Sequence, residues 1–148
     1  MNMHDVVREQ MAHVLPFLKL TGVEIVELTP SGGVARLNER AEVLNHIGTV
    51  HAGAVFTLGE AASGAAMTGI FADVIQSIRP VAAEARITYS KLARGTLTAR
   101  GSIGEPAEAL RSRFDAESRV AFEVNVDIKD LRGHSVASMV VAWNVRKA

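Results

Sequence analysis

The stretch from Ala52 to Ala72 constrains the fold of this chain more than any other part of its sequence. It is dominated by alanine and glycine, and Glu60 carries its only formal charge. A segment that is apolar nearly all round predicts one long helix, and such a helix must be buried inside the protein. Its small side chains allow another backbone or a ligand to approach closely.

The same stretch is long enough to cross a bilayer, so a membrane span has to be weighed. Two features argue against it: alanine and glycine dominate the segment, and an unpaired carboxylate near the centre of a span is costly. We therefore expect a buried helix and no membrane span.

The rest of the chain has mainly strand character. Apolar residues within 3–15 have helical spacing and predict a short covering helix. Residues 105–119 are charged and lack a clear period, so we expect a loop or the mobile end of a hairpin there. Six other segments, several of them bounded by turn residues, predict strands: 22–29, 34–40, 83–92, 96–104, 119–129 and 137–145.

The arrangement of these segments predicts an α+β fold. Links of hairpin length favour antiparallel pairing of the strands. Only the sheet can bury the long helix, so we expect a curled antiparallel sheet of about six strands wrapped around one central helix. The short N-terminal helix completes a single domain over residues 1–148.

The composition excludes several classes of protein. Sixteen Lys and Arg residues balance sixteen Asp and Glu residues, so no nucleic-acid partner is indicated. The absence of cysteine excludes a disulfide scaffold, a thiolate nucleophile and a cysteine-ligated metal. The first residues carry charges where a signal peptide would need an apolar core, which predicts a mature cytoplasmic protein.

One segment resembles the motif of the PaaI-like acyl-CoA thioesterases of the phenylacetate pathway: Asn45-His46-Ile47-Gly48-Thr49-Val50-His51-Ala52-Gly53, followed by Leu58 and Glu60. That family has the hotdog fold, in which an antiparallel sheet wraps a long helix. Residues 86–101 also resemble the strand pair that follows the helix in this family. The resemblance covers residues 16–104 well and residues 120–146 by pattern.

The resemblance implies hydrolysis of acyl-CoA thioesters to a free acid and coenzyme A, with no cofactor beyond the coenzyme A of the substrate. Glu60 stands at the catalytic carboxylate, which acts as general base on water or as nucleophile. Ala52 stands where a glycine N–H polarises the thioester carbonyl, so the N–H is kept and a methyl group is added. Asn45 matches the asparagine that holds water or substrate, and His51 the histidine that shapes the turn.

These residue types suit thioester chemistry. A helix N-terminus offers unpaired N–H groups and a partial positive charge to a developing oxyanion. Burial in an apolar helix should raise the pKa of Glu60 and make it a stronger base. Ala52 and Glu60 are eight residues apart, roughly 12 Å along one helix, so they cannot both reach one carbon. Two antiparallel copies would bring them together, so we expect a homodimer with shared active sites, and pairing of dimers into tetramers stays open.

The substrate-binding candidates lie in two groups. The first shares the face of Glu60 and suits an acyl pocket or a partner helix: Gly53, Phe56, Thr57, Ser63 and Gly64. No second polar catalytic group is clearly placed, and the candidates are Thr57, Ser63 and Ser77. The second group gives a local positive charge that would attract the phosphates of coenzyme A or be solvated strand surface: Arg86, Lys91, Arg94 and Arg100.

Other interpretations stay open. Glu60 can be a buried structural carboxylate, and His51 a hydrogen-bonding residue at the helix start instead of a proton shuttle. A zinc site from His46, His51 and Glu60 has no common ligand spacing, so we expect no metal. A non-catalytic acyl-CoA or fatty-acyl sensor would use the same pocket. A hotdog dehydratase or hydratase would need a differently spaced histidine and acid, which the sequence lacks.

Overall fold

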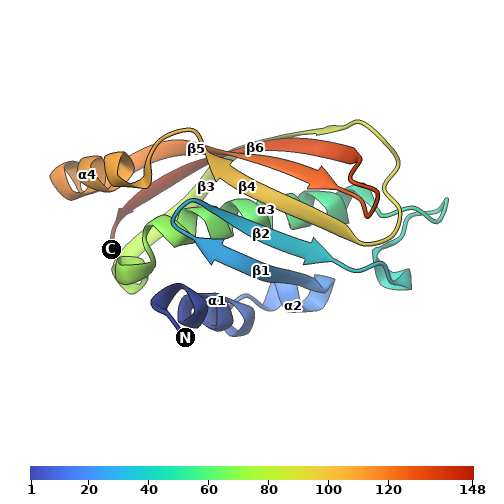
Figure 1. The fold of residues 1–148 in the computed structure, drawn as a ribbon, viewed down its shortest axis with the longest axis horizontal. Coiled ribbons are helices and arrows are strands. Elements are labelled where there is room, and N and C mark those ends of the chain that lie inside the picture. The colour runs from blue at the N-terminus through green and yellow to red at the C-terminus, as the bar shows by residue number, and fades with distance from the viewer.

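The computed structural model describes every residue from Met1 to Ala148. Figure 1 shows the order of the helices and strands along the chain. The helices are α1 (Met3–Val14), α2 (Pro16–Thr21), α3 (Ala52–Ile70) and α4 (Ala107–Glu117), with short 3-10 turns at Ala41–Val43 and Ala72–Ser77. The strands are β1 (Val23–Thr29), β2 (Gly32–Leu37), β3 (Ile78–Tyr89), β4 (Leu97–Ile103), β5 (Arg119–Lys129) and β6 (Ser135–Lys147).

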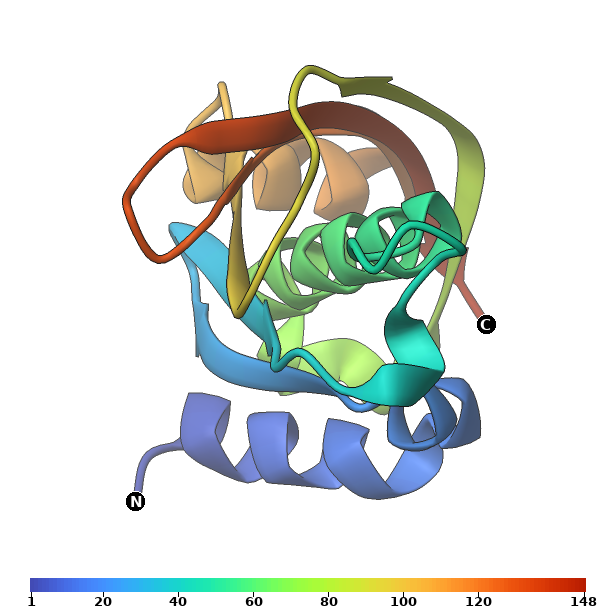
Figure 2. The ribbon, with the colours of Figure 1, turned by 90° about the vertical axis from the view of Figure 1, so that its right-hand side faces the viewer.

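The six strands form one antiparallel sheet in the order β1-β2-β4-β5-β6-β3. Figure 2 shows this sheet arching over α3 from β1 to β3, with α1 below. The predicted fold, a curled sheet around one long central helix with a short N-terminal helix, is therefore confirmed.

The central helix α3 is packed against the sheet by its small residues. Every residue from Ala61 to Ile70 is buried. A Cβ atom at Gly33 of β2 would lie 2.5 Å from the Ala66 nitrogen, and one at Gly101 of β4 would lie 2.8 Å from the Ala62 oxygen. Backbone and helix therefore approach to a distance that only glycine permits at these two positions.

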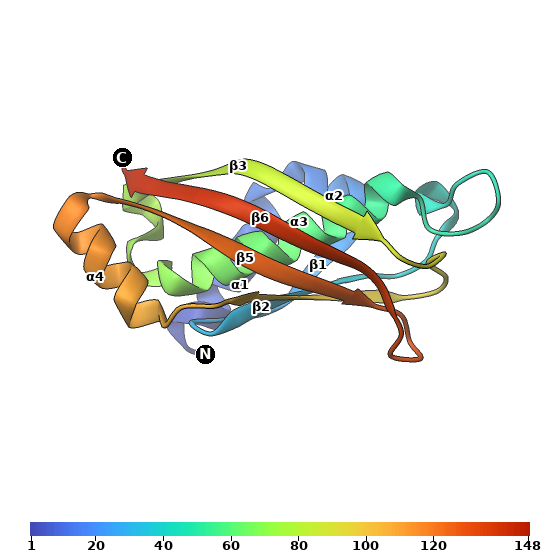
Figure 3. The ribbon, with the colours of Figure 1, turned by 90° about the horizontal axis from the view of Figure 1, so that it is seen from above.

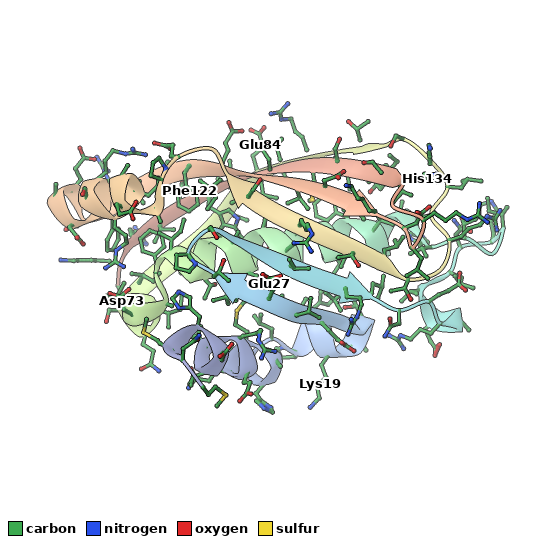
Figure 4. The ribbon with its side chains drawn as sticks, in the orientation of Figure 1. Lys19, Glu27, Asp73, Glu84, Phe122 and His134 are labelled. Carbon is green, nitrogen blue, oxygen red and sulfur yellow. The ribbon has the colours of Figure 1, made fainter.

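The two C-terminal strands supply much of the core. The predicted alternation in β5 and β6 is confirmed, because alternate side chains along each strand are buried. In the side-chain view, Phe122 of β5 lies on the inner side of the sheet (Figure 4). Its ring stacks on Phe71, just beyond the end of α3, with the ring centroids 6.3 Å apart.

The segment 105–119 corrects the prediction of a loop, because residues 107–117 form α4. Leu110 and Phe114, four residues apart, are both buried, and they hold the helix on the sheet end. Charged side chains dominate the segment and concealed this sparse apolar pair; most of them are exposed, but Arg111 is partly buried. Strand β3 also begins earlier than predicted, at Ile78, where it already pairs with Lys147 of β6.

None of the helices combines the length and the apolar character that crossing a bilayer requires.

Candidate active site

Glu60 lies near the middle of α3, with its carboxylate half-buried. The carboxylate oxygens form no hydrogen bond and no ion pair within the chain, although nine other ion pairs are present. Burial raises the pKa of Glu60 above its ordinary value, since the charged form loses hydration. A partly buried carboxylate without a partner is unusual for a structural residue, and it is suited to accept a proton.

The start of α3 leaves one N–H group free. His51 caps the helix: its Nδ1 atom accepts a hydrogen bond from the Gly53 N–H at 2.8 Å, so the neutral ring carries its proton on Nε2. The N–H groups of Ala54 and Val55 donate to the His51 carbonyl at 2.9 and 3.0 Å. The N–H of Ala52 has no acceptor in the chain. His51 thus acts as the hydrogen-bonding residue at the start of the helix, which is the alternative to a proton shuttle.

Asn45 organises the loop that leads into this helix. Its side-chain oxygen accepts hydrogen bonds from the N–H groups of Ile47 and Thr49, both at 3.1 Å. Its amide nitrogen donates to the Thr49 hydroxyl at 2.7 Å. The loop is tied to the rest of the domain because the N–H of Val50 donates to the Ala93 carbonyl at 2.8 Å. Asn45 therefore helps fix the direction in which α3 begins.

A small groove of about 120 Å³ opens beside the free N–H. Its lining includes Asn45, Ala52, Tyr89 and Lys91. Three of these four were predicted site residues, and the fold brings them together from three separate segments. The fourth, Tyr89, was missed: it is the only tyrosine of the chain, and its hydroxyl donates to the Ala52 carbonyl at 3.1 Å.

A second and larger cavity, about 540 Å³, lies on another side of the helix start. Gly53 and Thr57 line it, seven and three residues before Glu60, so it opens on the same face of α3 as the carboxylate. Phe17 and Leu20 of α2 form much of its apolar wall and are largely exposed. Sequence reasoning missed both, because nothing in the sequence indicates that α2 lies beside the start of α3. The Thr57 hydroxyl donates to the Gly53 carbonyl at 2.9 Å, which fixes its rotamer.

Two other candidates, Ser63 and Gly64, are fully buried and line neither cavity. The Ser63 hydroxyl donates to the Glu60 carbonyl at 2.7 Å and accepts from the Trp143 indole at 3.2 Å. Gly64 lies beside the same indole, with 3.7 Å from its ideal Cβ position to the ring. Phe56 is half-buried and packs on the core. Within one chain, Ser63 is thus occupied by structural hydrogen bonds.

The four basic residues predicted as one cluster do not form one surface. Strands β3 and β4 are separated in the sheet by β6 and β5. Arg86 of β3 lies 3.6 Å from Glu84 and 3.9 Å from Glu123, and Glu84 projects outward from the sheet (Figure 4).

The other three basic residues also lie apart from one another. Arg100 of β4 lies 4.0 Å from Glu27 of β1. Arg94 is exposed in the connection between β3 and β4. Only Lys91 lines a cavity at the start of α3.

The edge of the sheet at β3 is open. Strand β3 pairs only with β6, and Figure 3 shows it as the outermost strand on that side. Most of its residues are exposed. A long strand with unpaired N–H and C=O groups is a template for pairing with another chain.

The imidazoles of His46 and His51 do not gather with Glu60 into a group that could hold a metal ion.

The curled sheet and its enclosed helix define the hotdog class, and solved structures share this fold. A probable thioesterase of unknown function from Pseudomonas aeruginosa superposes with a TM-score of 0.83 at 22% identity, over 97% of this chain and 95% of that one. The PaaI protein of the E. coli phenylacetic acid degradation operon superposes with a TM-score of 0.75 at 17% identity, over 99% and 94%. A mutant of the phenylacetic acid degradation protein PaaI from Thermus thermophilus gives 0.68 at 22%, over 88% and 98%. The resemblance to PaaI-like proteins thus extends to the whole fold.

The chain belongs to the DUF4442 family, described as a domain of unknown function, whose profile matches residues 4–145. No curated protein matches the chain.

Proposed function

We propose that this protein hydrolyses acyl-CoA thioesters to a free acid and coenzyme A. One observation carries the proposal. The half-buried carboxylate of Glu60, which has no partner, lies on the same helix as the Ala52 N–H, which has no acceptor, and Ala52 lines a groove. The solved structures with this fold include proteins named as thioesterases, which supports the same chemistry.

The Ala52 N–H is the donor for the thioester carbonyl oxygen. The first turn of α3 contains no acidic side chain, so the positive end of the helix dipole is not neutralised there. As the carbonyl carbon is attacked, negative charge grows on the oxygen, and the N–H and the dipole stabilise it.

Glu60 is the second catalytic group and acts as general base or as nucleophile. As general base it removes a proton from water, the hydroxide adds to the carbonyl carbon, and the tetrahedral intermediate expels the thiolate of coenzyme A. As nucleophile its carboxylate attacks the same carbon and forms an anhydride, which water then hydrolyses. Its raised pKa makes it a stronger base than an exposed glutamate.

The site requires two chains. The eight residues from Ala52 to Glu60 span roughly 12 Å of helix axis, so one chain cannot place both groups at one carbon. Pairing of two β3 edges in antiparallel fashion would set two α3 helices side by side in opposite directions. The open edge of β3 and the cavity on the Glu60 face of α3 support this homodimer.

Thiol release from a panel of acyl-CoA thioesters tests the proposal. We expect turnover by the wild type and its loss, by on the order of 10²–10⁴-fold, in Glu60→Gln and Glu60→Ala. Glu108→Gln is the matched control, because Glu108 is exposed on α4 and should leave turnover unchanged. Wild-type turnover in both Glu60 variants would refute the assignment.

A second candidate function, binding of acyl-CoA without hydrolysis, is tested by the same experiment. It is favoured by the Ala52 side chain, which is exposed at the groove, where its methyl group can obstruct the thioester. A wild type that binds acyl-CoA without releasing thiol would be an acyl-CoA sensor. Ala52→Gly would then gain turnover if the methyl group alone blocks the reaction.

A further inference from the structure

Three arginine side chains form a row across three neighbouring strands, at the end of the sheet away from the Ala52 groove. Arg146 of β6 lies directly opposite Arg79 of β3 on one side and Arg119 of β5 on the other. All three are exposed, and the alternation of buried residues puts them on the outer face of the sheet. They are far apart in sequence, so only the fold reveals the row.

The row is electrostatically unfavourable as it stands. Like charges directly opposite each other destabilise a sheet. Other arginines of the sheet have a carboxylate within 4.0 Å, as Arg36, Arg86 and Arg100 show. The three arginines of the row form no ion pair, in a chain whose net charge is zero. A concentrated positive charge of this kind is relieved by a bound anion.

The row also borders a cavity of about 600 Å³. Asn144 and Val81 lie in the next outward-facing positions of β6 and β3 and add a polar and an apolar contact. Glu117, at the end of α4, is the only acidic residue of the lining. The volume falls within the usual range for small-molecule sites. Guanidinium groups bind phosphate oxygens in a bidentate manner, and three of them suit a ligand with more than one phosphate.

We propose that this arginine row is a binding site for a phosphorylated nucleotide. One source of that group is the nucleotide end of a coenzyme A thioester, which rests on the function proposed above. If two β3 edges pair antiparallel, the Arg79 end of one copy lies beside the Tyr89 end of the other. The row is on the outer face of the sheet and the Ala52 groove on the inner face, so a thioester bound at both would pass around that end of the β3 pair. The other source is a free nucleotide, bound independently of any thioester.

Calorimetric titration tests the site without any need for turnover. The probes are coenzyme A, adenosine 3′,5′-bisphosphate and adenosine, and the variant carries Arg79→Gln, Arg119→Gln and Arg146→Gln together. We expect the variant to bind both phosphorylated probes at least tenfold more weakly than the wild type, and the wild type to bind adenosine far more weakly than the bisphosphate. Added salt should weaken the wild-type complexes more than those of the variant.

Arg132→Gln is the control, with the same type of substitution made once, at an exposed loop residue outside the row. It should bind like the wild type, and circular dichroism should show all variants folded. Unchanged affinity in the triple variant, an equal loss in Arg132→Gln, or a wild type that binds neither phosphorylated probe would overturn the proposal.

Kinetics then distinguish the two sources. If the nucleotide end of the substrate binds the row, the triple variant raises KM for an acyl-CoA but not for the matching acyl-pantetheine, which lacks the nucleotide. If a free nucleotide is the ligand, both KM values are unchanged while bisphosphate binding is lost. A protein without thioesterase activity would refute the proposed function and leave the titration result standing.

Discussion

The two ends of α3 differ in how their backbone groups are satisfied. At the C-terminal end, the Ile70 carbonyl accepts a hydrogen bond from Arg111 at 3.1 Å, and the Gly69 carbonyl is 2.9 Å from the His4 ring. Arg111 also binds Asp73, which lowers the pKa of that carboxyl, and it lies over the Phe71 ring. At the N-terminal end, the Ala52 N–H has no partner and no acidic side chain neutralises the dipole.

This contrast separates stability from function along a single helix. Unsatisfied backbone groups at a helix end reduce stability unless water, a side chain or a ligand binds them. The closed C-terminal end, with its cation and packed aromatic rings, anchors α3 in the domain. The open N-terminal end keeps a hydrogen-bond donor and an uncompensated dipole, which are the properties that an oxyanion site needs.

Of the changes that compare the two ends of α3, the largest expected effect comes from removing the free N–H at the open end. Ala52→Pro removes the N–H that the proposed mechanism uses, so we expect turnover to fall by about 10²–10³-fold. The fold should survive, because proline is favoured at the first helical position. His51 already has the extended backbone, with φ −60 and ψ 139, that a following proline requires. Thiol release measures the loss, and Ala52→Gly, which keeps the N–H, is the control.

The same substitution shows whether the sites are shared. Glu60→Gln and Ala52→Pro chains should each form an inactive homodimer. A mixed dimer has one intact site, built from the Ala52 N–H of the first chain and the Glu60 of the second, and should recover about half of the wild-type turnover. Purified heterodimers with two distinct affinity tags make the measurement. Absence of recovery in a folded heterodimer, or an active monomer, would disprove shared sites.

A smaller effect, of a different kind, is expected at the closed end. Arg111→Ala removes the donor to the Ile70 carbonyl and the partner of Asp73, so the free energy of unfolding should fall by about 1–3 kcal/mol. Turnover should not change, because Arg111 lies beyond the last turn of α3, far from Ala52. Urea unfolding and thiol release on the same sample test both statements. A loss of activity without a loss of stability would contradict the division between the two ends.

The sequence predicted what depends on local pattern. The apolar run predicted α3, the strict alternation predicted β5 and β6, and the motif spacing located Ala52 and Glu60 on one helix. Each of these signals lies within one continuous segment, where helical and strand periods are visible.

The features that sequence reasoning missed depend on strand pairing across the chain. The pairing of β3 with β6 separates Arg86 from Arg100 and aligns Arg79 with Arg146. Tyr89 reaches Ala52 only because the end of β3 passes the start of α3. Residues 107–117 form a helix because Leu110 and Phe114 find a sheet end to cover, and sequence periodicity does not show that contact.

The smallest expected effect is the loss of stability that results from burying the ionisable Glu60 side chain. Burial raises its pKa in the folded state above the ordinary value that the unfolded chain has. As the pH rises, the unfolded state therefore loses the proton first, and the free energy of unfolding falls until the folded-state pKa is passed. Glu60→Gln cannot ionise, so it should have a higher Tm than the wild type at pH 7.

That difference should shrink on acidification and vanish below a pH of about 4, where Glu60 is protonated in both states. Thermal unfolding at a series of pH values measures it, with Glu9→Gln, at an exposed position in the middle of α1, as the control that should lack this pH-dependent gain. A structural carboxylate held by a partner would behave in the opposite way, because removing its charge would lower the Tm at pH 7. The sign of the shift thus distinguishes a glutamate kept for chemistry from one kept for stability.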